Sequence, residues 1–360
     1  MTTNPASNYR IGKAQLDLLK ELTNANGVSG NEGEVREIVR KRVSGLADEV
    51  KVDAMGNLLV RKHARKTPAF RVMMDAHMDE VGFMLVEQES DGMFLFEQVG
   101  GGDERQFISK AVVVGKEKIP GVIGCKPIHL TDAGERETII AKTSLRIDLG
   151  PAGKDKATRG DYAAYATRFH RAGDAIFAKA LDDRLGCATL IEILKTVPEH
   201  IDFLASFTVQ EEIGLRGAKI AAYDFDPQVV IAVDSTPAHD LPRPDGRENT
   251  QYNCKLRHGP AIYLSDAGTL SDPRLIRYLK DVAEENKIPY QFRQPGGGGT
   301  NAGALHLTRQ GVPAVSVSIP GRYAHTAVML ASVSDWQNTL RLLKLALEQL
   351  TPDVLKEDRF

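Results

Sequence analysis

The sequence is poor in cysteine, nearly balanced in charge and free of long apolar runs. Its 360 residues include three cysteines, Cys125, Cys187 and Cys254, which lie far apart and form neither a disulfide framework nor a CxxC metal site. There is no 18-residue apolar span and no N-terminal apolar stretch of the secretory type. The 46 basic and 48 acidic residues give a net charge of −2, so neither nucleic acid nor an anionic membrane is expected as a partner. These absences predict a soluble, cytoplasmic protein.

Two common catalytic motifs are also missing. No Gly-x-Ser-x-Gly elbow occurs, which argues against a serine hydrolase. The glycine-rich stretch 296–299 lacks the Gly-Lys-Ser/Thr ending of a P-loop, so nucleotide binding is not expected. Its glycines are better explained by a backbone that must approach a site closely.

Hydrophobic patterning predicts an α/β fold, with a mixed central sheet flanked by helices and an inserted all-β domain. Apolar residues recur at helical spacing over 13–24, 35–43, 273–285 and 334–350. Runs typical of buried strands occur over 70–74, 203–209, 229–233 and 314–319. Between 81 and 172, short β-like runs separated by Gly and Asp turns replace this alternation. We therefore predict a catalytic domain in two parts, 1–80 and 173–360, with a β-rich insertion over 81–172.

Acidic and histidine side chains follow the ends of several of these strand-like runs. They are His77 and Asp79, Glu211 and Glu212, Asp234, and His325, while Asp182 and Asp183 open a helix after another apolar segment. In an open α/β sheet, sites form outside the carboxyl ends of the strands, so we expect these residues to converge. Two histidines and several carboxylates suit Zn²⁺, Co²⁺ or Mn²⁺. One carboxylate shared by two ions, with a histidine and a further carboxylate on each, would make a two-metal hydrolytic site.

Each of these residues taken alone has a simpler explanation. A Glu-Glu pair in a loop is commonly just solvated, and a single His at a strand end is commonly a hydrogen-bonded structural residue. Asp182 and Asp183 could serve only as a helix cap, and Asp234 could form an ordinary Asx turn. Their joint occurrence at strand ends is what favours a metal site.

Four motifs, in order over nearly the whole chain, resemble the tetrahedral-aminopeptidase family. They are DAHMDEVGF (75–83), ALDDRLG (180–186), QEEIGLRGA (210–218) and IPGRYAH (319–325). Members of this family are also labelled glutamyl aminopeptidase or cellulase, and they are dinuclear metallo-aminopeptidases. The resemblance implies an enzyme that removes N-terminal residues from short peptides. It also implies a fold like that of the dinuclear zinc exopeptidases and two divalent ions per subunit, with zinc as the first expectation and cobalt or manganese as alternatives.

The resemblance further implies a role for each candidate residue. Five would be metal ligands: His77 and Asp234 on one ion, Glu212 and His325 on the other, and Asp182 bridging both. Glu211 would be the general base that takes a proton from the attacking water and returns it to the leaving amine. Asp79 would orient His77, because a ligating His normally donates its other N–H to a carboxylate.

Assembly and one departure complete what the resemblance implies. In the family, the β-rich insertion makes subunit contacts, and dimers assemble into a hollow tetrahedral dodecamer, so a homo-oligomer is expected. Family members commonly carry Glu four residues after the ligand His, where this chain has Met329. The ligand His325 itself is intact, so Met329 affects the expected hydrogen bonding around it rather than metal binding.

Two other functions stay open at this point. A dinuclear deacylase or carboxypeptidase would use the same site but would ignore substrates with a free amine. A catalytically silent assembly module would keep the β-rich insertion and bind no metal. The intact set of ligands and base favours the aminopeptidase over both.

Overall fold

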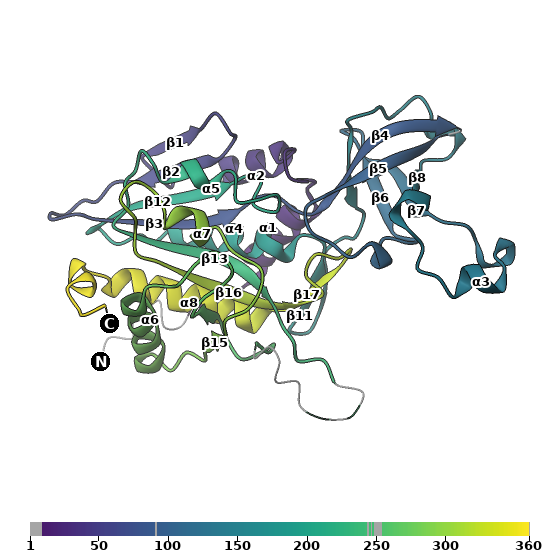
Figure 1. Cartoon of the computed structure of the whole chain (residues 1–360). Helices are drawn as coiled ribbons and strands as arrows, with labels where there is room; N and C mark the ends of the chain where they lie inside the picture. The colour runs from purple at the N-terminus through teal and green to yellow at the C-terminus, as the bar shows by residue number, and fades with distance from the viewer. Residues whose placement is uncertain (1–8, 91, 243–244, 246, 248–253, 360) are drawn as a thin grey trace.

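A large mixed β-sheet forms the centre of the main body, and a β-barrel projects from one side of it (Figure 1). The computed structural model describes residues 9–90, 92–242, 245, 247 and 254–359. The main path of the sheet, in order of pairing, is Glu49–Val52 (β1), Leu58–Lys62 (β2), Ile201–Thr208 (β12), Phe70–His77 (β3), Val229–Pro237 (β13), Ala314–Arg322 (β16), Met329–Ser332 (β17), Ala175–Ala178 (β11) and His170–Ala172 (β10). Two further strands, Ala261–Tyr263 (β14) and Gln291–Arg293 (β15), extend the sheet from β16.

The four central strands β12, β3, β13 and β16 are neighbours and run parallel to one another. They are buried along almost their whole length, which explains why their sequences read as continuous apolar runs rather than alternating ones. In the register of the sheet, His77 lies opposite Thr208, and Asp234 lies opposite Ser318. The carboxyl ends of all four strands therefore meet at one edge of the sheet.

Helices cover both faces of this sheet. The longer ones are Lys13–Asn24 (α1), Gly33–Val43 (α2), Leu181–Leu194 (α4), Pro273–Glu285 (α6) and Val333–Gln349 (α8). Their apolar residues form one core with Val72, Met74 and Ala76 of β3. The short helices Ala218–Ala221 (α5) and Ala302–Leu305 (α7) form a second core with Met73, because successive side chains of a strand point to opposite faces.

The barrel is closed by six antiparallel strands. In order of pairing they are Gly82–Ser90 (β4), Met93–Val99 (β5), Arg146–Asp148 (β8), Ile119–Gly124 (β7), Ala111–Val114 (β6) and Tyr162–Tyr165 (β9). The ring of Phe83 lies at the centre of its core and contacts Phe96, Phe107 and Tyr165 edge-on, with centroids 5.0–5.3 Å apart. Among the described residues of 81–172, the only α-helix is the four-residue Ala133–Arg136 (α3), as the sequence predicts.

The predicted fold class is confirmed, although several short elements escaped prediction. The strands β14 and β17 have three and four residues, which is too few for a periodic pattern. The strand β10, which the expected insertion 81–172 includes, pairs with β11 in the large sheet. The insertion as a separate domain with those boundaries stays a prediction. No helix in the described part of the chain is long and apolar enough to cross a membrane.

Candidate metal centre

The sequence-predicted site residues come together at the carboxyl edge of the central strands. His77 is the last residue of β3, and Asp234 lies in β13. Glu211 and Glu212 follow β12, and His325 follows β16. Asp182 completes the group at the start of α4, which packs against β3 and β13. Strands separated by more than 200 residues in sequence thus supply one site.

Asp182 lies between the two histidines. Its Oδ1 is 3.3 Å from Nε2 of His77, and its Oδ2 is 3.4 Å from Nε2 of His325. Nε2 of His77 also faces Oδ1 of Asp234 at 3.7 Å, and Nε2 of His325 faces Oε2 of Glu212 at 3.2 Å. The five residues therefore form two groups of three that share Asp182, and the possible ligand atoms of each group lie within 4.8 Å of one another.

Burial and mutual repulsion perturb the carboxylates of this cluster. Burial raises the pKa of Glu212 to about 8, with Asp182 contributing in the same direction and His325 opposing it. Burial likewise raises the pKa of Asp234 to about 6, again with Asp182 contributing. The pKa of Glu211 lies well above its usual value, because of burial and the nearby Asp234 and Glu212. Ionised carboxylates this close together repel one another, and a positive charge between them would stabilise their ionised forms.

The donor set fits divalent cations. Within the described ranges, no Lys or Arg forms an ion pair with Asp182, Glu211, Glu212 or Asp234. Oδ1 of Asp182 is buried and has no hydrogen-bond donor. Imidazole and carboxylate ligands at two adjacent positions are those that Zn²⁺, Co²⁺ or Mn²⁺ accept, so the residues present match the predicted pair of ions.

Asp79 is fully buried behind the cluster and holds two of its parts in place. Its carboxylate lies 3.4 Å from Nδ1 of His77, which also contacts the backbone carbonyl oxygen of Asp79 at 3.2 Å. The carboxylate accepts hydrogen bonds from the backbone N–H groups of Glu211 and Glu212 at 3.0 and 3.1 Å. The hydroxyl of Ser29 donates a further hydrogen bond of 2.6 Å. Burial alone would raise the pKa of Asp79, but His77 and these donors together lower it below its usual value. Nothing in the sequence pattern pointed to Ser29.

Asp79→Asn is expected to lower both kcat/KM and metal affinity by about 10- to 100-fold. Asn keeps the size of the side chain but loses its charge and one acceptor oxygen, so His77 and the two backbone N–H groups compete for the single oxygen left. Steady-state kinetics and competition with a chelator would measure both effects. Ser29→Ala, which removes one donor to the same carboxylate, should have a smaller effect, and unchanged metal affinity in Asp79→Asn would contradict the orienting role.

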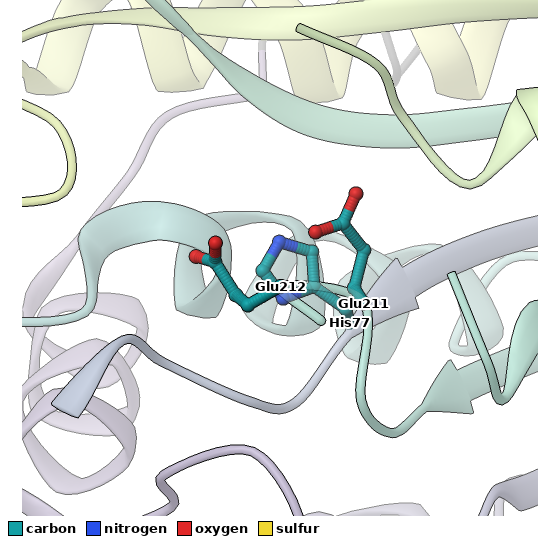
Figure 2. A group of neighbouring side chains, drawn as sticks. All are labelled: His77, Glu211 and Glu212. Carbon is teal, nitrogen blue, oxygen red and sulfur yellow. The ribbon is translucent and has the colours of Figure 1, made fainter. Parts of the chain in front are cut away.

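Glu211 and Glu212 are adjacent in sequence but point to different sides of His77. Figure 2 shows their carboxylates on opposite sides of the imidazole ring. Glu212 faces His325, whereas no hydrogen bond or ion pair engages the side chain of Glu211 within the described residues. The two carboxylates are therefore placed for different tasks.

The turns that carry the site are conformationally strained. Ala180, Gln210, Tyr323 and His325 all have φ between 54° and 64°, the left-handed region that non-glycine residues seldom adopt. Each of them lies in or next to a turn that delivers a candidate ligand. Such strain persists where the surrounding structure over-determines the backbone, and it is common at functional sites.

A cavity of about 550 Å³ opens onto this cluster. Its walls include the candidate ligands together with Tyr263, Arg293 and the glycines 297–299. The glycine-rich loop thus borders the site, as the sequence suggested. Arg293 and Tyr263 were missed, because each ends a three-residue strand without a motif. The nearness of Arg293 to the glycine-rich loop was the one available signal.

Three further positions flank the site. Arg322 forms two hydrogen bonds with the carboxylate of Asp240, at 2.7 and 2.9 Å, and Arg216 is exposed. Met329 is buried at the start of β17 and borders a small space beside Lys179, Glu212 and His325. A thioether there supplies neither a charge nor a strong acceptor to the histidine.

Comparison with known proteins places the chain among the aminopeptidases. The chain belongs to the M42 glutamyl aminopeptidase family, which matches residues 56–342. A second family, described as AMPT, matches residues 13–38. The lysyl aminopeptidase of Pyrococcus furiosus is 34% identical over 348 residues, covering 93% of this chain and 97% of the relative. The glutamyl aminopeptidase of Lactococcus lactis is 31% identical over 356 residues, covering 95% and 98%.

Solved structures agree with this assignment. The aminopeptidase APDkam598 from the archaeon Desulfurococcus kamchatkensis has a TM-score of 0.89 and 32% identity, covering 95% of this chain and 97% of that one. The TET1 peptidase of Pyrococcus horikoshii, described as able to assemble into a tetrahedron or a large octahedral shell, has a TM-score of 0.82 and 30% identity, covering 93% and 100%. The resemblance to tetrahedral aminopeptidases is confirmed, and the relatives support a peptide hydrolase.

Proposed function

We propose that this chain is a metal-dependent aminopeptidase that removes N-terminal residues from short peptides. The observation that carries the proposal is the position of Asp182, each of whose oxygens faces a different histidine. Asp234 and Glu212 complete the two groups around it. Membership of the M42 family supports peptide hydrolysis as the reaction.

The chain's own residues divide the work of the reaction. When bound by His77 and Asp234, by His325 and Glu212, and by the shared Asp182, two divalent ions supply Lewis-acid activation of a carbonyl and of a water. Glu211 stands beside this position, within 4.8 Å of ligand atoms of His77 and Glu212, and no hydrogen bond or ion pair holds its carboxylate among the described residues. It accepts the proton of the attacking water on a carboxylate oxygen and returns that proton to the leaving amine. The acidic walls of the cavity also favour the α-ammonium group of a peptide.

The proposed enzyme is a homo-oligomer whose barrel takes part in subunit contacts. Three large apolar side chains in the connection between β7 and β8, Ile128, Leu130 and Ile139, are 63–76% exposed. Such exposure is typical of a surface that a partner covers. The TET1 peptidase, which is similar over 93% of this chain, is described as able to assemble into a tetrahedron or a large octahedral shell. A related structure is described as a dodecamer, and both support a dimer-based assembly up to a dodecamer. Light scattering behind size-exclusion chromatography tests the proposal, and a monomer would contradict it.

The reaction itself is tested with aminoacyl-p-nitroanilides that have a free or an acetylated amine. Zinc- or cobalt-loaded protein should cleave only the free-amine substrates, because the acetyl group removes the α-ammonium charge. A chelator should lower the rate more than about 100-fold, and added metal should restore it. Cleavage of the acetylated substrates would instead indicate a deacylase. If protein with two bound ions cleaved none of these substrates, that result would contradict any hydrolase of this kind.

A further inference from the structure

Arg293 is a buried arginine in the wall of the cavity. It ends β15, is 8% exposed, and its guanidinium lies over the ring of Tyr263 at 4.5 Å. Its Nε donates to Oγ1 of Thr236 at 3.2 Å, and its two terminal nitrogens donate to the carbonyl oxygens of Ser265 and Gly297 at 3.4 and 2.7 Å. All three acceptors are neutral, so the positive charge has no ion-pair partner among the residues that the structure describes.

This arrangement leaves Arg293 with unused binding capacity. A guanidinium carries five N–H groups, and the three hydrogen bonds leave two of them without an acceptor in the described part of the chain. No Asp or Glu among those residues forms an ion pair with it, whereas Arg322 nearby is satisfied by Asp240. Burying a positive charge without an opposite charge beside it is unfavourable, which makes a bound anion favourable.

Arg293 is also near the candidate metal centre. Its partner Thr236 lies two residues beyond Asp234 in β13, a span of roughly 6–7 Å along a strand. The same cavity is lined by Asp234 and by Arg293, and no other Lys or Arg of the described chain lines it. Beside the guanidinium, a Cβ added at Gly297 or Gly299 would meet no atom within 4 Å. The glycine-rich loop therefore leaves room for a side chain of the substrate.

We propose that Arg293 binds the carboxylate of the side chain at the residue being removed, so that the enzyme prefers peptides beginning with Glu or Asp. The inference rests on the proposed aminopeptidase function. Family membership does not decide it, because relatives of similar identity are named for glutamyl and for lysyl substrates. A planar guanidinium offering two N–H groups is suited to bidentate binding of a carboxylate.

The test compares kcat/KM for the p-nitroanilides of Glu, Asp, Leu and Lys with metal-loaded protein. The unaltered enzyme should favour the acidic substrates by about 10- to 100-fold, the range for hydrogen bonds to a charged group. Arg293→Met should lower kcat/KM for the Glu and Asp substrates by at least about 10-fold more than for the Leu substrate, and Arg293→Glu should favour Lys. Arg309→Met is the control for losing an arginine that stacks on a tyrosine, because Arg309 lies over Tyr223 at 4.4 Å but is exposed and does not line the cavity.

Several outcomes would overturn the inference and leave the aminopeptidase standing. One is faster cleavage of Leu than of Glu by the unaltered enzyme, a result that does not depend on whether a variant folds. Another is an equal loss of kcat/KM for all substrates in Arg293→Met, which would indicate a purely structural role. A third concerns the dipeptide Ala-Leu and its C-terminal amide. If Arg293→Met lowered kcat/KM for Ala-Leu but not for the amide, Arg293 would bind the terminal carboxylate of the substrate.

Product binding separates failure of the inference from failure of the proposed function. If no substrate is cleaved although two ions are bound, the aminopeptidase is wrong. Calorimetric titration of the metal-loaded protein with L-glutamate and L-leucine still reports on the pocket in that case. Tighter binding of glutamate, lost in Arg293→Met but not in Arg309→Met, would support the acidic pocket, and equal binding of both amino acids would refute it.

Discussion

Glu211→Gln is expected to lower kcat by about 10³-fold or more while leaving the metal content unchanged, because general acid–base catalysis contributes about 10²- to 10⁴-fold. Gln occupies the same volume but cannot accept the proton of the attacking water. No hydrogen bond or ion pair engages the side chain of Glu211 within the described residues, and its carboxylate lies within 4.8 Å of ligand atoms of His77 and Glu212. Rates on a free-amine p-nitroanilide, together with metal analysis of the purified variant, would measure the two quantities.

The neighbouring carboxylate provides the matched comparison. Glu212 faces Nε2 of His325 at 3.2 Å, so Glu212→Gln should lose metal as well as activity. Two adjacent residues of the same type are thus expected to give different results. Full activity in Glu211→Gln would remove the general-base role. Loss of metal in that variant would instead make Glu211 a ligand, which its position beside His77 and Glu212 also permits.

Asp182→Asn is expected to reduce the bound metal from two ions to at most one and to lower kcat/KM by well over 100-fold. The wild-type carboxylate presents one oxygen to His77 and the other to His325, so it contributes to both groups of ligands. Asn is neutral and has one acceptor oxygen, so it cannot serve two cations. Replacing a residue that only supports a metal ligand lowers metal affinity or activity by about 10- to 100-fold. Replacing a ligand that both ions share should lower them further.

Asp183 is the control for Asp182. Oδ1 of Asp183 accepts a hydrogen bond from the backbone N–H of Gly186 at 2.9 Å, inside the first turn of α4. Asp183→Asn can keep that hydrogen bond, and two ions per chain should remain bound. Metal analysis and the thermal stabilisation produced by added zinc would compare the two variants. Retention of both ions in Asp182→Asn would contradict the bridging role.

The sequence by itself determined the fold class and the members of the cluster. Buried parallel strands read as continuous apolar runs, and the residues that directly follow them must lie at the carboxyl edge of the sheet. That reasoning reached His77, Glu211 and Glu212, Asp234 and His325 through local patterns. The same reasoning included Asp79 beside His77 and Asp182 with Asp183 at a helix start. The recognised motifs added an expected role for each residue, and the comparisons then confirmed the family.

Only the tertiary structure decided how these residues face one another. The two oxygens of Asp182 meet histidines about 105 positions before and 143 positions after it, and no local pattern encodes such distances. The hydrogen bond from the backbone N–H of Glu211 to Asp79 could not be predicted for the same reason, because it joins the ends of two neighbouring strands that are far apart in the sequence. Arg293 was not detectable, because its significance lies in having no ion-pair partner among the described residues and in the cavity beside it. Both are properties of packing, which three-residue strands far apart in sequence create only when the chain is folded.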